Sequence, residues 1–140
     1  MKKVFETLLM TPSRVRHTVS ILYLGVVAIL SLIPSRTFKD IPSFFEHMDK
    51  IVHFLIYGAM AALLCWTFRK RERRQFVYYT AVILFCIGYG ILMEGLQEAI
   101  HAVDRSFSWA DIVANSAGAV FFIPIKERFL PSGLDRLEQA

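Results

Sequence analysis

The sequence carries little charge for its length. Charged residues make up 20% of its 140 residues, whereas soluble domains average about 25%. Hydrophobic residues make up 55%, and the mean hydropathy is +0.45. This composition argues against a soluble globule and against a disordered chain, which requires low hydrophobicity. The length allows one domain, which we place over residues 1–140.

Cysteine is scarce, and the common catalytic motifs are missing. Cys65 and Cys86 both lie in apolar runs, without the spacing of a disulfide framework or a zinc finger. The sequence has no glycine-rich dinucleotide motif, no phosphate-binding loop and no HExxH motif. Its basic residues occur in short clusters between apolar runs, not on the single face or tail expected of a nucleic-acid-binding protein. We therefore expect no soluble enzyme, no nucleic-acid partner, no cofactor and no resident metal.

Four long apolar runs dominate the chain. They cover residues 17–33, 51–68, 76–100 and 109–125. A membrane-spanning helix needs about 20 mainly apolar residues, with a range of about 17–25. Since the hydrocarbon core offers no water, each run must satisfy its own backbone hydrogen bonds as a helix. The sequence predicts an all-α, four-span transmembrane helix bundle.

The positions of lysine and arginine predict the orientation of this bundle. Twelve of the sixteen lie in residues 1–16, 69–74 and 126–140, which an even number of spans places on one side. Short loops rich in lysine and arginine stay in the cytoplasm. We therefore expect a multi-pass protein of the cytoplasmic (inner) membrane with both termini inside and residues 126–140 as a cytoplasmic tail.

Polar residues gather at the predicted outer end of three spans. They are Asp49, Lys50, His53 and Tyr57 in the second span, Glu94, Gln97, Glu98 and His101 in the third, and Asp111 and Asn115 in the fourth. Apart from Lys50, the polar residues of each span follow helical spacing (i, i+3, i+4 or i+7), so they share one helix face. A carboxylate facing lipid costs a few kcal/mol or more. The three faces are therefore predicted to meet in a polar pocket that opens outward.

Several of these residues also have purely structural interpretations. Ser108 precedes Asp111 by three residues and is expected to cap the fourth span. His53 needs a hydrogen-bond partner, for which Glu94 or Glu98 is a candidate. Glu94 is the hardest to explain structurally, because it follows a long apolar run.

The order of the polar residues resembles the VanZ-like family. The pattern is Asp49-Lys50-x-x-His53-x-x-x-Tyr57, then Glu94-x-x-Gln97, then Arg105, then Asp111-x-x-x-Asn115-x-x-Gly118. The resemblance covers residues 23–122 and implies a small bacterial integral membrane protein. Arg105 is an expected ion-pair partner for one carboxylate. The family's prototype is associated with low-level resistance to teicoplanin, a lipid-tailed glycopeptide, but many members occur away from resistance gene clusters. The resemblance therefore supports fold and membrane placement better than a drug phenotype.

Three functions remain open at this point. In the first, the pocket binds the headgroup of a membrane lipid, a lipid-linked envelope component or a lipoglycopeptide, and so modulates envelope and teicoplanin sensitivity. In the second, a membrane enzyme uses His53 as general base with Glu94 or Glu98 as its acid or orienting group. A metal site from His53, Glu94, Glu98 and His101 can also be drawn. In the third, the chain is a small transporter that would need to oligomerise.

Overall fold

Four helices make up almost all of the described chain. A computed structural model describes residues 7, 8, 10–34, 48–68, 75–100 and 106–130. The helices are α2 (Ser13–Ser31), α3 (Met48–Thr67), α4 (Gln75–Ala99) and α5 (Trp109–Phe129). The described residues contain no strand, so the predicted all-α class is confirmed.

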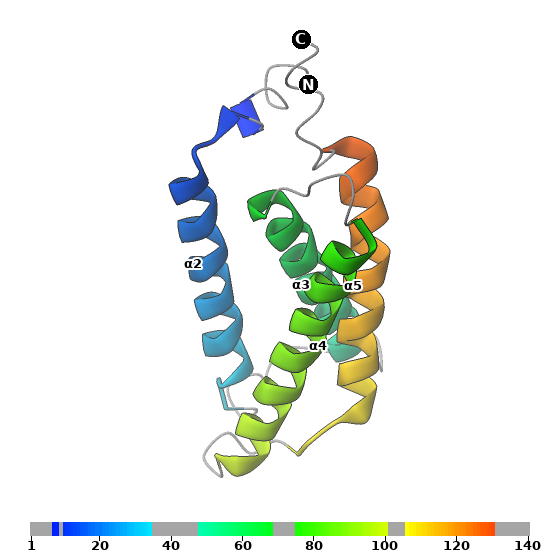
Figure 1. Cartoon of the computed structure of the whole chain (residues 1–140). Coiled ribbons are helices and arrows are strands. Elements are labelled where there is room, and N and C mark those ends of the chain that lie inside the picture. Colours follow the sequence, from blue (N-terminus) through cyan, green and yellow to red (C-terminus); the bar gives the residue numbers. More distant parts are fainter. Residues whose placement is uncertain (1–6, 9, 35–47, 69–74, 101–105, 131–140) are drawn as a thin grey trace.

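The helices alternate in direction, and α3 lies at the centre of the bundle (Figure 1). It contacts α2, α4 and α5, and its contact with α5 is the most extensive. The start of α2 and the end of α5 lie at the same end (Figure 1). The start of α3, the end of α4 and the start of α5 therefore meet at the opposite end, where the polar residues were predicted to gather.

The outer surface of the bundle suits a membrane. Helices α2, α3 and α4 are each long and apolar enough to cross one. Large apolar side chains face outward on them, such as Ile21 at 67% exposed and Leu84 at 61%. α5 has a span's length, with 21 residues. Polar residues interrupt its apolar sequence, and two of them, Asn115 and Lys126, are buried against the other helices.

Glycines allow α3 and α5 to pack closely. A Cβ atom placed on Gly118 would collide with the backbone carbonyl of Phe54 on α3. A Cβ atom on Gly58 would collide with the ring of Phe122 on α5. Small residues at such crossings are typical of membrane helices, because close backbones gain van der Waals contact that lipid does not provide.

The C-terminal end of α3 is tied to the other helices by polar contacts. The last carbonyls of a helix have no partner within it. Here Arg16 donates to Trp66 O at 2.9 Å, and Lys126 donates to Cys65 O at 3.3 Å. Both are cations at the negative end of a helix dipole, where they are stabilising. α5 thus continues beyond Ile125 to Phe129, and Lys126 belongs to the bundle instead of the expected tail.

The packing predicts a large effect for Gly118→Ala. The new methyl group meets backbone that cannot rotate away, so we expect the free energy of unfolding to fall by about 1–3 kcal/mol. Gly95→Ala on α4 is the matched control, because nothing lies within 4 Å of its Cβ position. Thermal unfolding in detergent should separate the two variants. Equal stability of both would contradict the close α3–α5 contact.

Candidate functional site

Three helices bring four polar side chains together, which we call the polar cluster: His53 on α3, Glu94 on α4, and Asp111 and Asn115 on α5. One nitrogen of His53 and one carboxylate oxygen each of Glu94 and Asp111 lie within 4.8 Å of one another. Glu94 and Asn115 are each only 1% exposed. These groups, far apart in sequence, form one buried site.

His53 lies between Asn115 and Asp111 of α5. Its Nδ1 lies 3.0 Å from Asn115 Oδ1, and its Nε2 lies 3.9 Å from Asp111 Oδ2. An amide oxygen only accepts hydrogen bonds, so Nδ1 carries the proton and donates it. In the neutral ring, Nε2 then directs its lone pair toward Asp111. The partner expected from the sequence was Glu94 or Glu98, but the amide of Asn115 takes that position.

The N-terminus of α5 explains how Glu94 is accommodated. Its Oε2 accepts a hydrogen bond from the backbone N–H of Ser108 at 2.9 Å. Ser108 is the N-cap of α5, and its Oγ accepts from the N–H of Asp111 at 3.3 Å, which confirms the predicted cap. Negative charge is stabilised at a helix N-terminus, where unpaired N–H groups and the helix dipole point outward. Two carboxylates therefore share this helix end.

Lys50, Asp49 and Tyr57 surround the polar cluster. Lys50 Nζ lies 2.9 Å from Asp49 Oδ2 and 3.9 Å from Asp111 Oδ1. Asp49 and Lys50 are substantially exposed, so this ion pair forms the rim of the site. Tyr57 is buried one turn further along α3, and its ring is parallel to that of His53 with centroids 6.4 Å apart. The site thus has a charged rim and an aromatic floor.

Some predicted site residues lie elsewhere. Gln97 is buried, but its Nε2 donates to Ser31 O at the end of α2, 2.8 Å away. Glu98 is exposed and does not belong to the group formed by His53, Glu94 and Asp111. Arg105 and His101 lie outside the described residues. Glu94 therefore belongs to the polar cluster, whereas Glu98, four residues later on α4, does not.

Two buried polar atoms of the site have no hydrogen-bond partner among the described residues. They are Asp111 Oδ1 and Asn115 Nδ2. Gly90 on α4 allows Asn115 to fit, because a Cβ atom there would lie 2.9 Å from Asn115 Nδ2 and 3.4 Å from Tyr57. Buried polar atoms are normally paired. Asp111 Oδ1 can therefore accept a hydrogen bond or bind a cation, and Asn115 Nδ2 can donate a hydrogen bond to a further acceptor.

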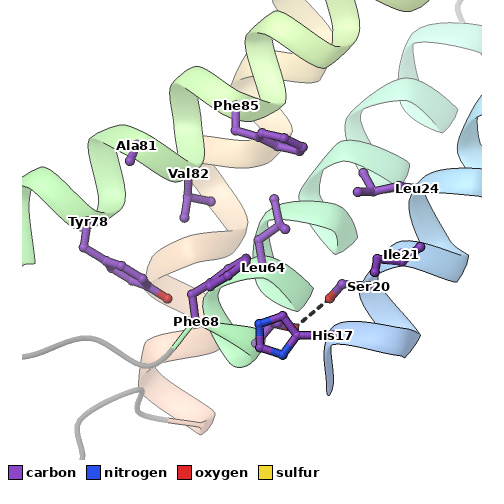
Figure 2. A pocket seen from close by; sticks show the side chains of 11 residues that line it. His17, Ser20, Ile21, Leu24, Leu64, Phe68, Tyr78, Ala81, Val82 and Phe85 are labelled. Atoms are coloured by element: carbon purple, nitrogen blue, oxygen red, sulfur yellow. Dashed lines mark hydrogen bonds between the residues drawn. The ribbon is translucent and has the colours of Figure 1, made fainter. Parts of the chain in front are cut away.

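An apolar cavity lies in the other half of the bundle. It has a volume of about 520 Å³ and lies between α2, α3 and α4 (Figure 2). Leu24, Leu64, Val82 and Phe85 line it, as do Ser20 and Thr67, whose hydroxyl oxygens lie 2.7 Å apart in a hydrogen bond. From His53 to Leu64, α3 rises by about 16 Å. The cavity and the polar cluster are therefore separate features, and sequence periodicity gave no sign of the cavity.

Comparison with known proteins identifies the family. The sequence matches the VanZ/LLP1 family over residues 5–126, which is most of the chain. The protein therefore belongs to the VanZ/LLP1 family, in agreement with the resemblance of its polar pattern. No curated protein and no solved structure matches the chain.

The hydrogen bond between His53 and Asn115 predicts the effect of Asn115→Ala. Loss of the amide leaves the buried His53 Nδ1–H without its acceptor, which should lower the free energy of unfolding by about 1–3 kcal/mol. Ser116→Ala is the neighbouring control, because the Ser116 hydroxyl donates to Ile112 O of its own helix and to no other group in the described part of the chain. It should shift stability by less than about 0.5 kcal/mol. Chemical denaturation in detergent micelles measures both, and equal losses would contradict the assignment.

Proposed function

We propose that this member of the VanZ/LLP1 family binds the polar headgroup of a lipid-linked envelope component or lipoglycopeptide at the outer end of its bundle. By doing so it modulates glycopeptide sensitivity, with teicoplanin as the drug of interest. The observation that carries this proposal is the buried Glu94, held beside His53 and Asp111 on three different helices. Ionisable groups inside membrane proteins are costly and usually serve a function.

The chemistry of the site suits a headgroup with both charge and hydrogen-bonding groups. Lys50 at the rim is suited to a phosphate or carboxylate of the ligand. Asp111 Oδ1 offers an acceptor for a hydroxyl, amide or ammonium group, and Asn115 Nδ2 offers a donor. A small number of well-placed polar groups is what gives a binding site its specificity.

The proposed orientation puts this site on the outer face of the cytoplasmic membrane. The support is the excess of lysine and arginine in residues 1–16, 69–74 and 126–140. In that orientation the apolar cavity lies in the inner half of the membrane. A headgroup bound at the polar cluster would keep its lipid tail in the outer leaflet, so the cavity is not part of this proposal.

One observation favours an alternative, a membrane enzyme. Asn115 orients His53 through Nδ1, which leaves Nε2 available as a general base next to Asp111. A nucleophile motif such as G-x-S-x-G does not occur in the sequence. Binding therefore remains the preferred function, and turnover of a lipid-linked substrate would identify the alternative.

The proposal predicts a loss of drug protection in Glu94→Gln. In a susceptible Gram-positive host, the wild type should protect against teicoplanin more than against vancomycin, because only teicoplanin carries a lipid tail. Glu94→Gln keeps the side chain's shape but removes its charge, so protection should fall to the empty-vector level at equal expression. Glu98→Gln, one turn away and exposed, is the matched control and should protect like the wild type. Protection by Glu94→Gln equal to that of the wild type would contradict the proposed site.

The orientation predicts which end of the bundle is reached from outside. Ala99→Cys lies at the end of α4 and should react with a membrane-impermeant maleimide on intact cells. Ser13→Cys, at the opposite end, should react only after lysis. Cys65 and Cys86 are each 0% exposed, so the parent protein provides a low background. Labelling of Ser13→Cys but not Ala99→Cys on intact cells would reverse the orientation.

A further inference from the structure

The polar cluster has the donor set of a metal centre. One imidazole and two carboxylates, each from a different helix, present ligand atoms within 4.8 Å of one another. We propose that His53, Glu94 and Asp111 hold a divalent transition-metal ion, with Zn²⁺ as the preferred ion. The metal site follows from this geometry. The further idea that the bound ion holds an anionic group of the headgroup rests on the proposed function.

The hydrogen bond of His53 prepares the ring for a metal. A histidine that binds a metal usually donates its other ring N–H to a carbonyl or carboxylate, which fixes the tautomer. Asn115 Oδ1 does this for Nδ1 at 3.0 Å. Nε2 is left with its lone pair on the side of Asp111 Oδ2, 3.9 Å away. The ring is thus oriented as a ligand without any change of rotamer.

Two of the three proposed ligands are carboxylates, whose negative charge favours binding of a divalent cation. Glu94 is buried and the Asp111 side chain is only 14% exposed. Burying carboxylates is costly unless they are paired or bind a metal. Among the described residues, Lys50 is the cation that pairs with Asp111, but its Nζ lies 3.9 Å from Asp111 Oδ1 and only 2.9 Å from Asp49 Oδ2. A divalent ion between the two carboxylates would use Asp111 Oδ1, which has no hydrogen-bond partner among the described residues, or its neighbour Oδ2.

The spacing and the ligand types favour zinc. Zinc binds imidazole nitrogen and carboxylate oxygen at about 2.0–2.2 Å, which places ligand atoms roughly 3.0–3.5 Å apart. The ligand atoms, now within 4.8 Å of one another, would have to approach to this spacing when the ion binds. Three protein ligands leave at least one position open, as in zinc sites that bind water or a ligand. Mn²⁺ is the comparison ion, since carboxylates suit it but a single imidazole favours zinc.

This ligand set differs from the one that can be drawn from sequence spacing alone. That set included Glu98 and His101, which have the spacing of a helical Glu-x-x-His pair in the sequence. The exposed Glu98 lies outside the polar cluster, and Asp111 from α5 supplies the third ligand instead. Glu98→Gln is therefore a control that changes a carboxylate on the same helix without touching the proposed ligands.

Calorimetric titration with Zn²⁺ and Mn²⁺ tests the site. The full chain, purified without a polyhistidine tag and stripped with chelator, is reconstituted in lipid nanodiscs. We expect one Zn²⁺ per chain, weaker Mn²⁺ binding, and wild-type affinity for Glu98→Gln. His53→Gln and Asp111→Asn should abolish stoichiometric binding. Asn115→Ala should weaken it about ten- to hundredfold, as expected for a group that orients a ligand.

A stability measurement separates metal binding from folding. Zn²⁺ should raise the unfolding temperature of the wild type and Glu98→Gln, because an ion that binds only the folded chain stabilises it. It should not do so for Asp111→Asn, even where that variant is folded. An absence of Zn²⁺ binding by the wild type, or equal binding by folded Asp111→Asn, would overturn the metal site.

The same variants keep the two proposals distinguishable. If the wild type binds no ion but Glu94→Gln still loses teicoplanin protection, the metal site is wrong and headgroup binding stands. If Zn²⁺ binds through these residues while no variant changes drug sensitivity, the metal site stands and the proposed function is wrong.

Discussion

A buried carboxylate inside a membrane helix needs polar partners, and Glu94 shows how this bundle provides them. A lipid-facing carboxylate would cost several kcal/mol. Glu94 instead lies 1% exposed against the N-terminus of α5, where Ser108 N–H binds it. This contact turns the Glu94 side of α4 toward α5. Once α4 is turned in this way, its other faces present apolar side chains such as Leu84 to the surroundings.

The central helix α3 is held at both ends and along its length. At one end His53 bonds to Asn115, and at the other Arg16 and Lys126 bind its last carbonyls. Between them, Gly118 brings the α5 backbone against α3. Polar groups at both ends of α3 are thus hydrogen-bonded to other helices. These bonds hold α3 in place, so it can position the polar cluster in a fixed geometry. Such preorganisation favours both selective binding and metal coordination.

Much of this arrangement could be predicted from the sequence, for physical reasons. The apolar runs lie within the observed helices or differ from them by a few residues at the ends, because the need to satisfy the backbone in lipid leaves little choice. The Ser108 cap followed from its spacing to Asp111. The alternation of helix direction brought the polar ends together.

The pairing within the site could not be predicted in the same way. Periodicity defines the face of one helix, but it does not define how two helices are rotated against each other. Asn115 therefore replaced the expected glutamate as the partner of His53, and Gln97 bonded to α2. Lys126 was expected in a tail because charge usually ends a span. It lies in α5 instead, because the α3 carbonyl of Cys65 accepts its hydrogen bond.

The most direct test of this account is the state of the His53 ring in a lipid bilayer. Solid-state NMR on protein with isotope-labelled histidine and asparagine reports both the tautomer and the proximity of the two side chains, and His53→Gln assigns the signal. We predict a protonated Nδ1 in close contact with the Asn115 amide. An Nε2-protonated ring without contact to Asn115 would contradict it, because the polar faces of α3 and α5 would then not meet.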